Sequence, residues 1–134
     1  LKKLPKTRTL KLADNIEILI CHGSPKSINE YLYPDVTSKK VNEVLGKYDY
    51  LACGHTHYQA IIKNKNRLLF NPGSVGQPRE RGKKGACWCS FDTKTKKVKF
   101  YDTKYDRTNV IKSAKKFDEK IDYLYKVLER WKIF

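Results

Sequence analysis

Apolar and polar residues alternate near the start of the chain in a way that predicts a β-hairpin. Leu10 and Leu12 alternate with polar neighbours, and residues 16–21 form a β-branched, apolar run after Asp14 and Asn15. Period-two alternation and β-branched runs are typical of strands, and Asp-Asn is typical of a tight turn. The pattern therefore predicts two strands joined by that turn.

A helix and further strands follow. Val41, Val44 and Leu45 recur at helical spacing within residues 36–45, and Gly46 can end that helix. Apolar runs bounded by turn residues predict further strands at 48–53, 59–63, 67–70, 86–92 and 96–101. Asn71-Pro72-Gly73-Ser74 after the third of these predicts a tight turn with a structural role.

Residues 105–134 change to a helical period. The apolar positions recur every three or four residues: Ile111, Ala114, Phe117, Ile121, Leu124, Leu128 and Trp131. This spacing predicts one long or two short amphipathic helices. With the preceding strands, the order of elements indicates a layered α/β sandwich rather than an all-β barrel.

The length of 134 residues fits one domain, which we assign to residues 1–134. The formal net charge of +15 favours anionic partners, but most of the excess is Lys. We therefore favour a solvated basic surface over a dedicated nucleic-acid groove. The chain begins without Met, which suggests a cleaved or truncated product.

The cysteines and the lack of long apolar runs bear on the compartment. Three of the four cysteines lie in apolar runs, and the cysteines are expected to be buried thiols of a cytoplasmic protein; they are Cys21, Cys53, Cys87 and Cys89. The spacing of Cys87 and Cys89 does not fit a zinc ribbon. No apolar run approaches the roughly 18 residues needed to cross a bilayer. We expect no membrane association.

The candidate chemistry lies in the three histidines, His22, His55 and His57. Each follows an apolar run, at the strand end where α/β sheets collect ligands. On an extended chain His55 and His57 would point to the same side about 6–7 Å apart, which suits one metal ion or two neighbouring ones. The histidines are therefore candidate metal ligands.

Three motifs resemble the calcineurin-like metallophosphoesterases. They are Cys-His-Gly-Ser-Pro at 21–25, Cys-Gly-His-Thr-His at 53–57 and Asn-Pro-Gly-Ser-Val-Gly-Gln-Pro-Arg at 71–79. Their order and spacing are similar to the C-terminal motifs of that superfamily, and most similar to its small prokaryotic predicted-phosphodiesterase branch. The resemblance covers almost the whole chain.

The resemblance implies that the chain is the C-terminal half of a four-layer αββα sandwich with a dinuclear metal centre. By analogy, His22 and His55 would bind one ion and His57 the other, with Mn as the first choice and Zn, Fe or Ni as alternatives. The family's carboxylate and Asn ligands precede the first histidine motif, and residues 1–21 contain none of those motifs.

The implied function is hydrolysis of phosphate esters, as a phosphodiesterase or phosphatase. Without a bridging carboxylate, neutral imidazoles cannot hold two divalent cations close together, so the chain alone is expected to be a poor catalyst that needs an N-terminal half. A non-catalytic scaffold of the same fold, of which a retromer subunit is an example, is the alternative; a basic nucleic-acid-binding module is a third.

Other residues could contact the substrate. Arg79 could bind its phosphate, although arginines on so basic a loop are commonly solvated. Tyr31 and Tyr33 could stack on a base, but we favour a place at the edge of the core for them.

Overall fold

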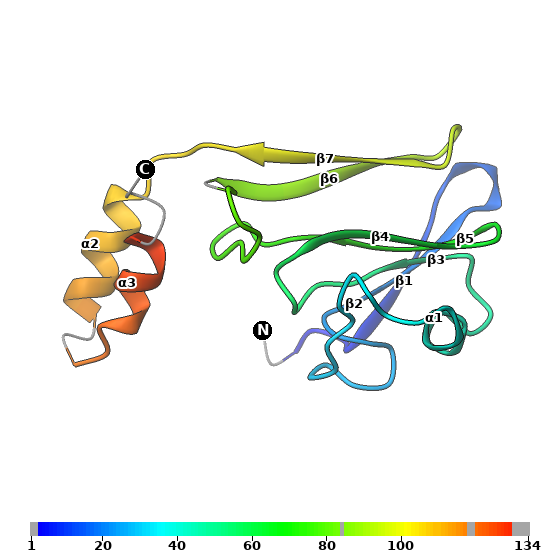
Figure 1. Ribbon diagram of the computed structural model, residues 1–134, viewed down its shortest axis with the longest axis horizontal. Coiled ribbons are helices and arrows are strands. Elements are labelled where there is room, and N and C mark those ends of the chain that lie inside the picture. The colour runs from blue at the N-terminus through cyan, green and yellow to red at the C-terminus, as the bar shows by residue number, and fades with distance from the viewer. Residues whose placement is uncertain (1–2, 84, 118–119, 130–134) are drawn as a thin grey trace.

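A five-stranded mixed sheet forms the centre of the computed structural model, which describes residues 3–83, 85–117 and 120–129 (Figure 1). Its spatial order is β1-β2-β3-β5-β4. The strands are β1 (Thr7–Lys11), β2 (Glu17–Cys21), β3 (Tyr50–Ala52), β5 (Arg67–Pro72) and β4 (Gln59–Asn64). The three central strands are parallel, and the outer strands β1 and β4 run antiparallel to their neighbours.

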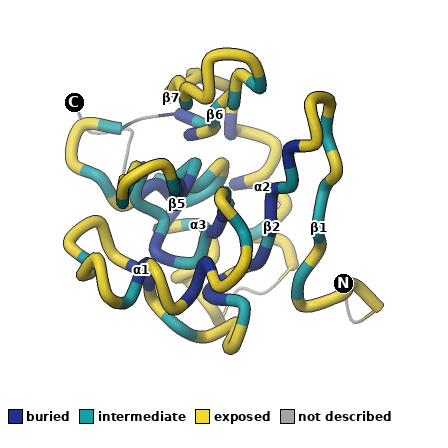
Figure 2. The backbone as a smooth tube through the Cα atoms, turned by 90° about the vertical axis from the view of Figure 1, so that its right-hand side faces the viewer, coloured by how far each residue is buried: buried dark blue, intermediate teal, exposed yellow. Residues whose placement is uncertain are grey.

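The predicted β1–β2 hairpin is present. A short 3-10 turn, Ala13–Asn15, joins the strands, and Asp14 and Asn15 adopt φ of 59° and 55°. Asp and Asn tolerate this left-handed region better than most residues, which explains their presence here. Figure 2 shows β2 largely buried and β1 more exposed at the edge of the sheet.

Helix α1 (Ser38–Leu45) covers one face of the sheet. Thr37 caps its N-terminus by accepting a hydrogen bond from the Lys40 amide at 3.2 Å, and Gly46 ends it with φ 54°. The helix packs its apolar side into a core that the sheet shares: Leu19, Cys21, Leu32, Val41, Val44, Leu45, Leu51, Cys53 and Leu69. Burial of this stripe stabilises a helix too short to persist alone.

The hairpin of β6 (Ala86–Asp92) and β7 (Lys97–Thr103) covers the other face. Phe91 stacks on Phe70 with ring centroids 5.7 Å apart. The Gln59 side-chain amide of β4 donates to the Tyr101 carbonyl oxygen at 2.9 Å, which joins the two sheets. The expected α/β class is therefore confirmed, with one helical layer and two sheet layers in the described residues.

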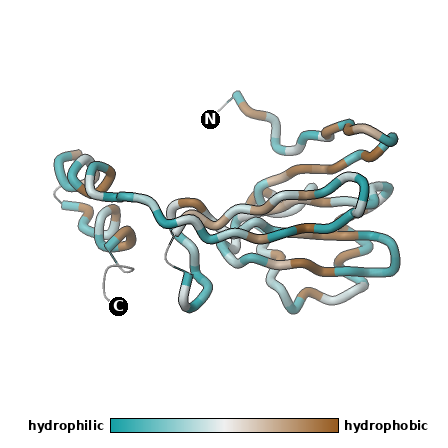
Figure 3. Tube along the Cα trace, turned by 90° about the horizontal axis from the view of Figure 1, so that it is seen from above, coloured by the Kyte–Doolittle hydropathy of each residue, from teal (hydrophilic) through white to brown (hydrophobic). Residues whose placement is uncertain are grey.

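The C-terminal region forms two short helices, α2 (Thr108–Phe117) and α3 (Tyr123–Glu129), which pack on each other beyond the end of the β6–β7 hairpin (Figure 1). Their small core contains Ile111, Val127 and Leu128. Figure 3 shows hydrophobic and hydrophilic positions on both helices, as expected for amphipathic segments. Trp131 lies outside the described residues, and the assignment of 1–134 to one partial domain stays a prediction.

Among the described residues, the structure contains no helix with the length and apolar character required to span a bilayer.

Candidate metal centre

His22 and His55 meet at the carboxyl ends of two adjacent parallel strands. His22 follows β2 directly, and His55 follows β3 after Cys53 and Gly54. The Gly54 amide donates to the His22 carbonyl oxygen at 2.8 Å, which continues the strand pairing into the loops. Parallel strands end at the same edge of a sheet, so this topology brings the two side chains together.

The two imidazoles converge through ring nitrogens. His55 Nδ1 lies 3.0 Å from His22 Nε2, and the ring centroids are 4.8 Å apart at 63°. His55 Nε2 is buried and has no hydrogen-bond partner among the described residues. When Nδ1 presents its lone pair, Nε2 carries the proton, and that proton then has no acceptor in the described part of the chain.

Residues 54–57 form a strained turn rather than an extended segment. His55 and His57 have φ of 66° and 64°, and the Thr56 amide donates to the Gly54 carbonyl oxygen at 2.8 Å. The expectation of an extended His-x-His arrangement is therefore wrong. Left-handed φ at a non-glycine residue costs about 1–2 kcal/mol, and such strain persists where surrounding contacts impose it.

Buried Asn71, the next-to-last residue of β5, supplies those contacts. Its amide Nδ2 donates to the Gly54 carbonyl oxygen at 2.8 Å and to Thr56 Oγ1 at 2.9 Å, while its Oδ1 accepts the Gly73 amide at 2.9 Å. Thr56 is also buried. The sequence pattern predicts only a tight turn at Asn71. Asn71 could have been found in the sequence, because it is a polar residue at the end of an apolar strand, and the histidines were identified by that same position.

The other histidine, His57, is fixed by the 71–79 segment. Because the Gln77 carbonyl oxygen can only accept, His57 Nδ1 donates to it, at 2.8 Å, and Nε2 is left with the lone pair. Burial lowers the pKa of His57, and the positive charge of Arg79 acts in the same direction. A neutral imidazole with one nitrogen held by a carbonyl is a form suited to metal binding.

Arg79 lies beside His57. The Arg79 amide donates to the His57 carbonyl oxygen at 3.2 Å, and its side chain is exposed. Its position is compatible with contact to an anion at the histidines, which stays a prediction. His22 also borders a largely apolar hollow of about 600 Å³, whose lining includes Lys6 and Arg8.

Gly23 allows the backbone after His22 to lie close against residues 27–30. A Cβ there would lie 2.6 Å from the Ile28 carbonyl oxygen and 2.7 Å from that of Glu30. Buried Ser24 organises the same loop, because its Oγ accepts the amides of Lys26 and Ser27 at 3.3 and 3.1 Å. A larger residue at Gly23 would displace the loop that carries His22.

The donor set of the chain fits part of a metal centre. A cation about 2.0–2.1 Å from each nitrogen, as for zinc, could be held by two nitrogens 3.0 Å apart. Within residues 3–83, 85–117 and 120–129, however, no group of three or more His, Cys, Asp or Glu side chains could hold a metal ion. The structure therefore brings His22 and His55 together and leaves His57 in an adjacent position without completing a site.

Comparisons with known proteins agree with this fold. The sequence model of the calcineurin-like phosphoesterase superfamily domain matches residues 1–96. The uncharacterized protein MJ0912 of Methanocaldococcus jannaschii is 32% identical, across 78% of this chain and 53% of its own length. The chain thus spans about half of that relative.

Two crystal structures share the fold. The hypothetical protein PH1004 from Pyrococcus horikoshii is 25% identical with a TM-score of 0.77, over 95% of this chain and 51% of that one. A metallophosphoesterase from Sphaerobacter thermophilus is 21% identical with a TM-score of 0.68, over 96% and 59%.

The fold is the mixed α/β fold of metallophosphoesterase structures. The chain belongs to the calcineurin-like phosphoesterase superfamily. The resemblance inferred from the three motifs is thereby confirmed, and archaeal relatives are consistent with the small prokaryotic branch.

Proposed function

We propose that this chain supplies the histidine ligands of a divalent-metal centre that hydrolyses phosphate esters, as a phosphodiesterase or phosphatase. The observation that carries the proposal is the convergence of His22 Nε2 and His55 Nδ1 at 3.0 Å from two separate strands. His22 and His55 would hold one ion, and His57 Nε2 would hold a second. Mn is our first choice for the metal, with Zn, Fe or Ni as alternatives.

The centre, when loaded, would polarise a phosphoryl oxygen and activate water. The chain's own residues have distinct roles. Gln77 holds the His57 ring by its Nδ1–H, and Asn71 holds the turn that carries His55. Arg79 would bind and orient the substrate phosphate through its exposed guanidinium.

Carboxylate ligands would come from outside the described residues, because no cluster of donors there is complete. An N-terminal half of the same protein is the proposed source, and this chain by itself is expected to be inactive or nearly so. The proposed partner is a phosphate-ester substrate in the cytoplasm, whereas nucleic acid as a dedicated partner is not favoured.

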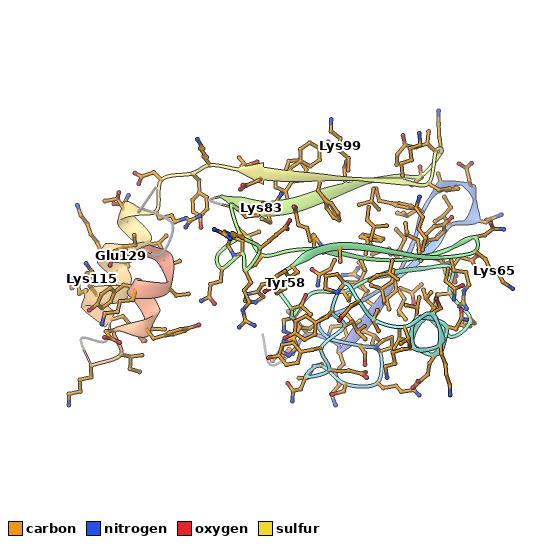
Figure 4. All side chains as sticks on the ribbon, in the orientation of Figure 1. Tyr58, Lys65, Lys83, Lys99, Lys115 and Glu129 are labelled. Atoms are coloured by element: carbon orange, nitrogen blue, oxygen red, sulfur yellow. The ribbon has the colours of Figure 1, made fainter. Side chains whose placement is uncertain are left out.

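Metal binding is the direct test. Isothermal titration of the chain with Mn²⁺ or Zn²⁺ should show binding that falls at least about tenfold in His22→Ala and in His55→Ala, because each loses one of two converging donors. Lys65→Ala is the matched control, since Lys65 lies in the turn at the opposite end of β4 from Tyr58 (Figure 4). Equal affinity in all variants would contradict the assignment.

Hydrolysis is the second test. Mn²⁺-dependent cleavage of bis-p-nitrophenyl phosphate is measured with this chain and, where its gene encodes a longer product, with that product. We expect activity in a longer product that contains the missing carboxylates, and its loss in His55→Ala. A folded, metal-loaded longer product without activity on phosphate esters would favour the scaffold alternative.

A further inference from the structure

A basic cavity of about 330 Å³ lies between the two sheets, at the end of β4 that is remote from the histidines. Lys65 directly follows β4, whereas Tyr58, the neighbour of His57, directly precedes it (Figure 4). The six residues of this strand span about 20 Å. The cavity is thus separate from the candidate metal centre. Its lining includes four cationic side chains and two apolar or aromatic ones: Lys63, Lys65, Arg67, Lys96, Tyr50 and Leu68.

Two hairpin turns from different sheets bring the charges together. Lys65 lies in the turn between β4 and β5, and Lys96 lies in the turn between β6 and β7. Both lysines have left-handed φ, 54° and 58°, a region in which Gly, Asn and Asp are the common residues. Local conformation therefore does not account for Lys at either position. Strain of this kind collects at functional sites, and the shared property of the two residues is their positive charge.

The walls of the cavity are fixed by contacts that need no ligand. The Arg67 guanidinium donates to the Tyr48 carbonyl oxygen at 2.6 Å, and its Nε lies 4.0 Å from the carboxylate of Asp49. The Tyr50 ring packs against Phe91 with centroids 5.0 Å apart. A ligand in the cavity would therefore meet a surface that is already ordered, which lowers the entropic cost of binding.

The lysines of the cavity are available to an anion. Within the described residues Lys63 and Lys65 form no ion pair. The Lys96 ammonium donates to the Thr93 carbonyl oxygen of its own turn, which leaves two of its three N–H donors. Four cationic side chains less the carboxylate of Asp49 leave an excess of three positive charges.

We propose that this cavity binds a diphosphate group, either free or carried by a nucleotide. One phosphate group carries about −1.5 to −2 charge at pH 7, so two such groups match the excess and one does not. Ammonium groups on flexible stems suit phosphate oxygens as partners, and the half-buried walls reduce screening by water. The inference is independent of the proposed function, because it uses no residue of the histidine centre.

Isothermal titration of the chain with inorganic pyrophosphate tests the proposal. EDTA is present, so that no divalent ion at the histidines contributes to binding. The double variant Lys63→Ala, Lys65→Ala should bind at least about tenfold more weakly, since one lost charged hydrogen bond corresponds to that factor. The double variant Lys112→Ala, Lys116→Ala removes the same charge from the exposed side of α2 and should bind as the parent does.

Two single variants separate this site from folding and from the metal centre. Lys65→Gly removes the charge but suits the φ of 54°, so its unfolding midpoint should be kept or raised while pyrophosphate affinity falls. His55→Ala should retain the affinity of the parent. A fall in His55→Ala equal to that in Lys65→Gly would place the anion at the histidines and overturn the proposal.

The class of ligand is tested with orthophosphate and adenosine diphosphate under the same conditions. Orthophosphate should bind at least about tenfold more weakly than pyrophosphate, because it leaves part of the charge unmatched. Equal affinity for adenosine diphosphate and pyrophosphate would show that the diphosphate alone is recognised, and tighter adenosine diphosphate binding would identify a nucleotide. Absence of pyrophosphate binding at low salt, or equal losses in the two double variants, would mean a solvated basic surface and refute the proposal.

Discussion

The side-chain amide of Asn71 donates to the carbonyl oxygen of Gly54 at 2.8 Å. This bond and the bond to Thr56 Oγ1 connect the end of β5 to the turn that carries His55 and His57. Both histidines have left-handed φ, so the turn depends on contacts of this kind to keep its shape. Asn71 thus positions the histidine turn from within the core, where it is fully buried.

Substitution of Asn71 by Ala should lower both stability and metal affinity. The change leaves the buried Thr56 hydroxyl and the Gly54 carbonyl without this donor, which costs about 1–3 kcal/mol of unfolding free energy. Urea unfolding and metal titration measure the two effects. Asn66→Ala, at an exposed turn position, is the control and should stay within about 0.5 kcal/mol of the parent. Equal behaviour of both variants would show that Asn71 does not hold the turn.

Substitution of Gly73 by Ala should destabilise the protein by about 2 kcal/mol or more. Gly73 has φ +86°, and a Cβ would lie 2.9 Å from both Cys87 Cβ and Gln59 Cγ. Gly76→Ala is the matched control, because a Cβ there meets nothing within 4 Å. Thermal unfolding of both variants tests this. If the Gly73→Ala protein is as stable as the Gly76→Ala protein, the backbone around Gly73 can move away from Cys87 and Gln59 at no cost, and the prediction is wrong.

The Cys53 thiol should make stability fall at alkaline pH. Burial raises the pKa of Cys53 from 9.0 to about 12, with a smaller contribution from Cys21. Because the unfolded chain loses its thiol proton first, the stabilising effect is complete below pH 9.0 and declines as the pH rises through the folded value. At pH 10 this thiol should cost about 1.4 kcal/mol relative to pH 8.

The measurement is urea unfolding of the parent and of Cys53→Ala at pH 8 and pH 10. The variant loses core packing at both pH values, so only the change between them is compared. The parent should lose more stability than the variant over this interval. Parallel losses would contradict the assigned protonation of Cys53.

Substitution of Arg79 by Ala should raise KM for a phosphodiester by about tenfold, since a charged hydrogen-bond donor to the phosphate is lost. Steady-state kinetics of this chain, or of a longer product where its gene encodes one, measure this effect. Arg81→Ala, at a nearby exposed residue of the same charge, is the control. High salt screens the charge of Arg79 and should make the increase in KM of Arg79→Ala smaller. The KM of Arg79→Ala should still remain above that of Arg81→Ala. Equal KM values would remove Arg79 from the substrate site.

The strands could be predicted from the sequence because their pattern is local. The β6 strand was predicted at 86–92 and lies at Ala86–Asp92, and the helix predicted at 36–45 begins only at Ser38, where Thr37 provides the cap. β5 was predicted to end at Phe70 but continues to Pro72. The apolar pattern ends earlier than the pairing does, because Asn71 and Pro72 still lie opposite β4 residues.

The sequence was sufficient to predict which histidines lie in the candidate site, but not the backbone geometry that holds them. Strand ends identified His22 and His55, since parallel strands bring their carboxyl ends to one edge. The left-handed turn at 54–57 could not be predicted, because the contacts that impose it come from Asn71 and Gln77, distant in sequence. Tyr31 and Tyr33 are 47% and 41% exposed, and this likewise depends on Leu32 between them packing into a core that forms only in the fold.

His22 and His55 can come together only after strand β2 has paired with strand β3. His22 and His55 are 33 positions apart, and parallel strands require a crossover connection rather than a tight turn. The unfolded chain therefore has no local segment that presents both nitrogens to one ion. Divalent cations should bind the folded chain in preference, so ion occupancy and the folded population form one linked equilibrium, and added metal should raise the unfolding midpoint.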